Sequence, residues 1–153
     1  MKKNITKKKQ RKQEPLFVTK YKKLHTKPAF RGHDWCRNLR HLKRSGVIIS
    51  KEYGKLTKEE LEAARRVIRS KSNKRGRLLI RVQPSLFLTK KPAQVRMGKG
   101  KGRVSSYVAF IRPGKILFEL QGLRKQRSCE CLLSGSKKLS LAVSVKYVSD
   151  LYK

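Results

Sequence analysis

Residues 56–60 contain the start signal of an α-helix, and this signal sets the register against which the rest of the chain must pack. Thr57 and Glu60 have the spacing of a capping box, in which each side chain accepts a hydrogen bond from the backbone N–H of the other residue. Leu56 can pack against Leu61 across the same turn, a contact that fixes how the chain enters the helix. Counted from this start, Leu61, Ala64 and Ile68 share the apolar face of the helix, and Val67 lies beside them.

Short apolar or alternating runs on both sides of the helix predict β-strands. Residues 47–49 are short enough for an edge strand, and residues 53–55 are expected to form a turn before the helix. After the helix and a linker at 71–76, alternation places two sets of side chains on opposite faces of a strand. The core face would hold Leu78, Ile80 and Val82, and the cationic face would hold Arg77 and Arg81.

The second half of the chain contains a turn signal and two further elements. Pro113 presets φ and Gly114 permits the positive φ of a type II turn, so the runs on either side are expected to form a hairpin. The expected elements are hairpin strands at 107–112 and 115–120, a poorer helix at 123–138 that is interrupted at 134–136, and a half-buried strand at 141–147.

These elements predict an α+β fold in two layers, with two helices on one face of a mostly antiparallel sheet of about four or five strands. A length of 153 residues is enough for one modest core but not for two independent ones. We expect residues 1–20 to form a basic N-terminal tail and residues 21–153 to form a single α+β domain.

The charge of the chain identifies its class of partner. Lysine and arginine total 42 against 9 aspartate and glutamate residues, which gives a formal net charge of +33. Such a chain repels itself unless an anion neutralises it, and solvated surfaces ordinarily mix both signs. No transmembrane run and no helix with an aromatic or leucine face points to a membrane. We therefore expect the domain to bind nucleic acid, with an affinity that depends strongly on salt.

Residues 90–103, which we call the glycine-lysine loop, are the strongest candidate for the contact with RNA. The loop lies between two apolar, strand-like runs, and its glycines let the backbone press against a ligand. It lacks the ending of a P-loop and the spacing of a dinucleotide fingerprint, which excludes a nucleotide pocket. A flexible linker is the alternative, but linkers favour Ser and Gly without this charge density. Its cations are Lys90, Lys91, Arg96, Lys99, Lys101 and Arg103.

The N-terminal region adds a candidate arm. Residues 1–13 are nearly all Lys, Arg, Gln and Asn, a composition that cannot bury enough surface to offset its ordering entropy. An alternation of rings and cations follows, and it fits a short strand or an extended arm along RNA. The residues of this arm are Tyr21, Lys22, Lys23 and His25.

The arginines of the first helix are candidates of a different kind. Glu62 is placed to pair with Arg66 one turn away. Arg65 and Arg69 are like charges one turn apart, a mildly unfavourable arrangement unless a phosphate lies between them. A solvated helix face explains any one of these arginines about as well as RNA binding does.

No set of residues supports catalysis. The carboxylates are scattered, three of them belong to the helix start, and a nuclease would need a cluster of them to hold Mg²⁺. The three cysteines are odd in number and sparse, which argues for a reducing compartment. A zinc site is a minor alternative that a zinc assay would decide, because the spacing matches none of the usual paired patterns. Its candidate ligands are His33, Cys36, His41, Cys129 and Cys131, and we otherwise expect no metal and no cofactor.

Six short motifs follow one another in order within residues 53–122. They are GKLT (54–57), EAARR (62–66), LIRV (79–82), KPA (91–93), VRMGKGKG (95–102) and PGKILFE (113–119). Together they closely resemble the large-ribosomal-subunit protein L-sixteen family of bacteria and organelles. The resemblance implies a two-layer α+β protein that binds large-subunit rRNA beside the A site. It also implies that the glycine-lysine loop extends towards the peptidyl transferase centre and helps to position aminoacyl-tRNA.

The resemblance also implies roles for single residues. In the loop, the matching functional positions are Arg96, Met97, Lys99 and Lys101. On the rRNA side they are Arg65, Arg66 and Arg81, and Tyr21, Lys22, Lys23 and His25 resemble the basic N-terminal arm of the family. With Arg69 of the helix and Arg77 of the cationic strand face, these residues make up the expected rRNA-binding set. The chain departs from the bacterial pattern at 30–49 and at 127–136, and these departures favour a mitochondrial ribosome, with a plastid or the bacterial cytoplasm as alternatives.

We therefore expect a structural, non-catalytic protein of the large ribosomal subunit. Its expected partners are rRNA, tRNA and neighbouring ribosomal proteins, with no membrane and no self-association. The alternative is a basic protein that compacts nucleic acid without a fixed site, a function for which charge alone would suffice.

Overall fold

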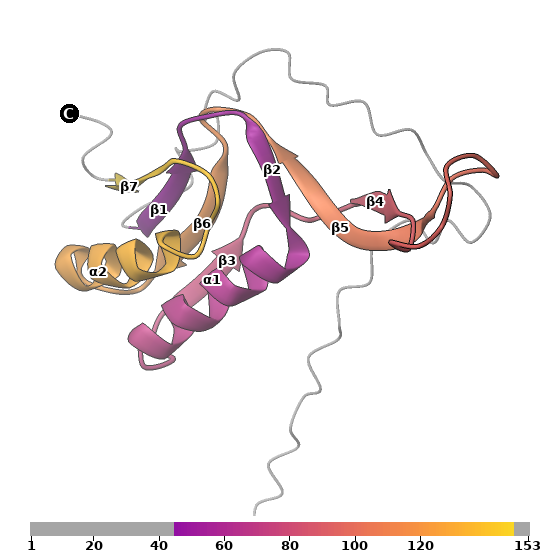
Figure 1. Cartoon of the computed structure of the whole chain (residues 1–153). Helices are drawn as coiled ribbons and strands as arrows, with labels where there is room; N and C mark the ends of the chain where they lie inside the picture. Colours follow the sequence, from indigo (N-terminus) through magenta and orange to yellow (C-terminus); the bar gives the residue numbers. More distant parts are fainter. Residues whose placement is uncertain (1–44, 149–153) are drawn as a thin grey trace, which may run out of the picture.

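The computed structural model of the chain describes residues 45–148, and there the α+β prediction is confirmed (Figure 1). The strand and helix bounds are Ser45–Ser50 (β1), Gly54–Thr57 (β2), Lys58–Lys71 (α1), Arg77–Ile80 (β3), Leu86–Lys90 (β4), Arg103–Ile111 (β5), Ile116–Gln121 (β6), Lys125–Ser136 (α2) and Val143–Tyr147 (β7). The tail and the arm expected near the N-terminus lie outside the described residues.

The described strands divide between two antiparallel sheets, and the single sheet that we expected is therefore wrong. One sheet has the strand order β3-β6-β1-β7 and the other has the order β2-β5-β4. Helix α2 packs against β1, β6 and β7, while α1 packs against α2 and contacts β2 and β5. The helices thus connect the two sheets, and the β4–β5 hairpin extends away from them (Figure 1).

Helix α1 begins where the capping box predicts. The Thr57 side chain accepts a hydrogen bond from the Glu60 N–H at 3.2 Å, and the Glu60 carboxylate accepts one from the Thr57 N–H at 2.8 Å. Leu61, Ala64 and Ile68 are buried, which confirms the apolar face. Local signals alone were sufficient here because every partner lies within one helical turn.

Strand β1 is an interior strand, so the prediction of an edge strand at 47–49 is wrong. It pairs with β6 on one side and β7 on the other, and all six of its residues are buried. Ile48 belongs to the main core, whereas Val47 and Ile49 pack with Val148 and Ile116 in a second apolar cluster. Because both faces of β1 meet apolar side chains, its middle residues 47–49 form an uninterrupted apolar run.

The turn at Pro113 and Gly114 is confirmed, but the hairpin around it is wrong. The Lys115 N–H donates to the Arg112 carbonyl at 3.2 Å, and Gly114 has a φ of +82°. The turn is also bonded to Ser50, whose carbonyl accepts from the Gly114 N–H at 2.9 Å and whose N–H donates to the Lys115 carbonyl at 3.0 Å. This bonding directs β6 to β1 in one sheet, while β5 pairs in the other.

Two smaller predictions are also corrected. Residues 53–55 do not form a turn, because Gly54 begins β2 and pairs with Ile111 of β5. On β3, Leu78 packs against the core and nearby Val82 is buried, but the Ile80 residue is 42% exposed. Strand β3 is the outer strand of its sheet and Ile80 is its last residue, which leaves this side chain at the border of the core.

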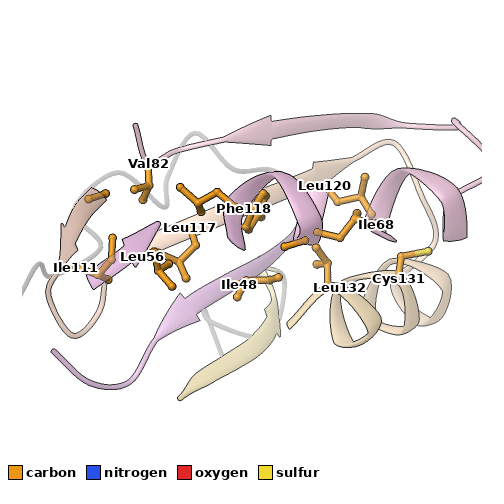
Figure 2. Close-up of a cluster of buried hydrophobic side chains, with 13 residues drawn as sticks. Ile48, Leu56, Ile68, Val82, Ile111, Leu117, Phe118, Leu120, Cys131 and Leu132 are labelled. Carbon is orange, nitrogen blue, oxygen red and sulfur yellow. The ribbon is translucent and has the colours of Figure 1, made fainter. Parts of the chain in front are cut away.

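The core lies where β6, β1 and the two helices meet (Figure 2). Leu117, Phe118 and Leu120 of β6 are at most 1% exposed. Helix α2 is continuous through 134–136, so the predicted interruption is wrong. Gly135 is buried against Ile68, and a Cβ at this position would lie 2.4 Å from the Ile68 Cγ1 atom. The glycine therefore permits close packing of the two helices.

We predict that Gly135→Val lowers the free energy of unfolding by about 2 kcal/mol, because an overpacked core costs about 1–3 kcal/mol. The matched control is Leu133→Val, which places the same side chain on the exposed face of α2 and is expected to change stability by less than about 0.5 kcal/mol. Urea denaturation of the two variants measures the difference. Equal stability would show that the contact with Ile68 is not tight.

Candidate nucleic-acid interface

The glycine-lysine loop is held at the end of the β4–β5 hairpin, which confirms that strands anchor both ends. Lys90 pairs with Arg103 at the base of the loop, and the ladder continues to Leu86 and Val108. A shift in register between Leu88 and Thr89 interrupts the ladder. Such bulges increase the local twist and redirect a strand end. The hairpin therefore presents the loop away from both helices (Figure 1).

Glycines give the loop its backbone shape. Gly98, Lys99 and Gly100 have φ values of +90°, +50° and +87°, a region in which Gly is at ease and Lys is strained. At Gly102 a Cβ would lie 2.6 Å from the Lys90 carbonyl oxygen, so the two sides of the loop approach closely at its base. The loop thus has a defined course that depends on glycine at these places.

The loop cations differ in what they contact. Lys91 donates from its ammonium group to the Gly98 carbonyl and so links the two sides of the loop. Arg96 and Lys99 are exposed and form no hydrogen bond or ion pair with any residue of 45–148. Met97 is 98% exposed. Val95, also in the loop, is 54% exposed. The loop therefore offers uncompensated cations and two apolar side chains to a partner, while Lys91 holds its shape.

The arginines of α1 are partly neutralised by one carboxylate. Glu62 accepts from Arg65 in a bidentate pair, with both distances 2.7 Å, and from the Arg66 Nε at 3.0 Å. These bonds lower the pKa of Glu62 to about 2, and the hydrogen bond from Arg65 is the largest cause. The predicted pair with Arg66 is confirmed. The pair with Arg65 was not predicted, although its spacing of three residues is a usual helix pairing.

Arg81 and Arg69 have structural partners. The Arg81 guanidinium donates to Glu119 at 2.8 and 2.5 Å, and the Glu119 carboxylate, which is 0% exposed, also accepts from the Gln121 side chain. Arg69 donates to the Gly76 carbonyl at 3.0 Å. Glu119 was treated as one of the scattered carboxylates. Its position inside the apolar run of β6 is the signal that a buried charge needs a cationic partner.

Some of the remaining candidates, those of the N-terminal arm and of the zinc site, lie within residues 45–148 and others lie outside them. Tyr21, Lys22, Lys23, His25, His33, Cys36 and His41 lie outside the described residues. Cys129 and Cys131 lie on α2 outside any disulfide. Burial raises the pKa of the Cys131 thiol, which disfavours the thiolate that binds a metal. Residues 45–148 contain no group of three potential metal ligands, so the zinc site stays a minor hypothesis. No helix in this part is long and apolar enough to span a membrane.

Residues 5–146 match the family described as ribosomal protein L16p/L10e. The chain belongs to this family. Its members are structural ribosomal proteins, so the prediction of a protein without enzymatic activity is confirmed. The family also makes rRNA and other ribosomal proteins the expected class of partner, as the sequence motifs imply.

Three bacterial relatives illustrate the similarity. Large ribosomal subunit protein uL16 of Xylella fastidiosa strain M12 is 39% identical over 126 residues, which cover 82% of this chain and 90% of the relative. The protein of the same name from Xanthomonas oryzae pv. oryzae strain PXO99A is 38% identical over the same coverage. That of Mesorhizobium japonicum is 44% identical over 90 residues, or 59% of this chain and 66% of the relative. The ribosome is therefore of bacterial type, which does not distinguish an organelle from a bacterium.

We predict that Glu62→Gln removes part of the pH dependence of stability in acid. The folded pKa of Glu62 lies below the reference value of 4.5, so its contribution is present above that value and is lost as the pH falls through about 2. Solvent screening limits the contribution to about 1 kcal/mol. The control is Glu59→Gln on the same helix. Thermal melts between pH 5 and 2 should show that wild type and Glu62→Gln converge, and parallel curves would contradict the pairing.

Proposed function

We propose that the chain is a structural protein of the large ribosomal subunit that binds rRNA. We further propose that its glycine-lysine loop contacts tRNA near the A site and the peptidyl transferase centre. The observation that supports this most directly is the exposed pair Arg96 and Lys99, uncompensated within residues 45–148 and anchored by two strands. The name of the relatives, large ribosomal subunit protein uL16, supports the placement in that subunit.

The shape of the loop suits a nucleic-acid backbone. Glycines at 98 and 100 keep side chains away from the chain, so that a phosphate can approach backbone N–H groups directly. Arg96 can bind a phosphate with two parallel hydrogen bonds, whereas Lys99 supplies a point charge. Met97 is unbranched and apolar and can pack against a base or a ribose. Together these groups provide binding energy without any group for chemistry.

The predicted rRNA-binding arginines of the scaffold differ in whether a carboxylate of the protein already binds them. Arg77 is exposed and makes no ion pair within residues 45–148, and the Arg66 side chain is 74% exposed, so both can reach a phosphate. Arg65 would have to share its guanidinium with Glu62. Arg81 forms an ion pair with the buried Glu119. It therefore stabilises the sheet and supports rRNA binding only indirectly.

Non-specific compaction of nucleic acid is the competing function. The net charge of +33 would suffice for it, but charge alone does not require a loop of defined course. Lys99 in a strained conformation and the link from Lys91 to Gly98 favour a fixed site. Compaction predicts that every exposed cation contributes alike, and a fixed site predicts that the loop cations differ from the rest.

The location of the ribosome is a separate proposal. The departures from the bacterial pattern at 30–49 and 127–136 support a mitochondrial ribosome, with a plastid or the bacterial cytoplasm as alternatives. Fractionation of the source cells, followed by detection of the protein on large subunits from each compartment, separates the three locations.

We predict that Arg96→Ala weakens binding of aminoacyl-tRNA to the A site by about 10- to 100-fold, because a hydrogen bond to a charged group contributes about 1.5–3 kcal/mol. The matched control is Lys146→Ala, which removes an exposed cation from β7. Filter binding of tRNA to ribosomes that contain each variant provides the measurement. Affinity of the free protein for bulk RNA should change little in either variant. Equal losses in both assays for both variants would favour compaction.

A further inference from the structure

Two loops that are distant in sequence meet at one end of the β3-β6-β1-β7 sheet. Arg77 at the start of β3 pairs with Gln121 at the end of β6. A Cβ at Gly76 would lie 2.5 Å from the Gln121 carbonyl oxygen, so the two segments are in close backbone contact. Arg127 of α2 donates to the Lys71 carbonyl at 3.0 Å and joins the same segments. We call residues 71–77 and 122–127 the paired-loop surface.

The paired-loop surface contains cations and no carboxylate. The cations are Lys71, Lys74, Arg75, Arg77, Arg124, Lys125 and Arg127. Lys71, Lys74, Arg75, Arg77 and Arg124 are exposed and form no ion pair with any described residue. Arg127 pairs with Glu130, which lies outside the surface, at 3.5 Å, and both side chains are exposed. Like charges gathered this densely repel one another, which makes the surface costly in the isolated protein.

The first loop is held in a strained shape. Asn73 and Lys74 have φ values of +50° and +59°, and for a lysine this conformation costs about 1 kcal/mol or more. Hydrogen bonds maintain it, since the N–H groups of Asn73, Lys74 and Arg75 donate to the carbonyls of Ser70, Arg69 and Ser72 at 2.9–3.1 Å. A flexible linker would carry the same charge without this strain. The loop is therefore preorganised to present its cations.

The start of α2 has the opposite charge pattern to that of α1. Helix α1 begins with a side-chain cap and with Glu59 and Glu60 in its first turn. Helix α2 has Arg124 at its N-cap position, no side-chain cap and no acidic residue in its first turn. Cations at this end oppose the helix dipole. An external anion would offset both the dipole and the repulsion within the paired-loop surface.

We infer that the paired-loop surface binds a second segment of RNA backbone, at the end of the molecule opposite the glycine-lysine loop (Figure 1). This inference rests on the proposed function and specifies where the scaffold contacts RNA. An acidic protein is the less suitable partner, because none of the exposed large hydrophobic side chains of residues 45–148 lies on this surface and protein interfaces have an apolar centre. Contacts at both ends would fix the orientation of the hairpin relative to the RNA.

The test is a triple substitution, Lys74→Gln, Arg75→Gln and Arg124→Gln, in the full chain. The matched control substitutes three exposed cations elsewhere, Lys55→Gln, Lys58→Gln and Lys146→Gln. Each protein is rebound to large subunits that lack it, over a series of KCl concentrations. If the three cations contact phosphates, the slope of log affinity against log salt falls by about two to three for the paired-loop variant and stays near the wild-type value for the control.

Further variants separate this inference from its alternatives. The charge-keeping set Lys74→Arg, Arg75→Lys and Arg124→Lys should restore the slope, which shows that charge rather than folding is measured. A photo-crosslinking residue at position 74 should give adducts with rRNA, and adducts with protein alone would overturn the inference. Equal slopes for the triple variant and wild type would also overturn it. Failure of the wild-type chain to rebind would instead overturn the proposed function, and this inference with it.

Discussion

Burial of β6 against both helices is the constraint on which the rest of the structure depends. Leu117, Phe118 and Leu120 are nearly inaccessible, and they meet Ile68 of α1 and Leu132 of α2 in one cluster. A chain with a net charge of +33 resists compaction, so this small apolar centre must supply most of the free energy that opposes repulsion. The short distance between the helices at Gly135 makes the centre dense enough to do so.

Four carboxylates of residues 45–148 serve the scaffold. Glu60 caps α1, Glu62 neutralises two arginines, and Glu119 holds Arg81 within the sheet. Glu52 accepts a hydrogen bond from the Ala142 N–H at 2.6 Å and ties the chain after β1 to the approach to β7. The glycine-lysine loop and the paired-loop surface contain none. Cations without a carboxylate partner are thereby concentrated at the places where a polyanion can bind. In the described core, the buried charge of Glu119 is matched by Arg81.

A feature was predictable from the sequence when the residues that interact to form it are close together in the chain. The start of α1 and the turn at Gly114 rest on neighbours within a few residues, and both were predicted correctly. The path of β6 and the pairing of Arg81 with Glu119 depend on groups that are distant in sequence, which no local pattern encodes. The loop was recognisable by charge and glycine, but the link from Lys91 to Gly98 required the folded backbone. Burial of β1 on both faces was likewise a tertiary effect.

The bulge in the β4–β5 hairpin bears on how such a chain can vary. Side chains alternate between the two faces of a strand, so the gain or loss of one residue between Leu86 and Lys90 would exchange the faces beyond it. The register shift after Leu88 already uses one such irregularity to orient the ribbon. Insertions and deletions should therefore be rare in both strands of the hairpin. They should accumulate in loops that do not carry the hairpin, where a change of length does not exchange the two faces of a strand.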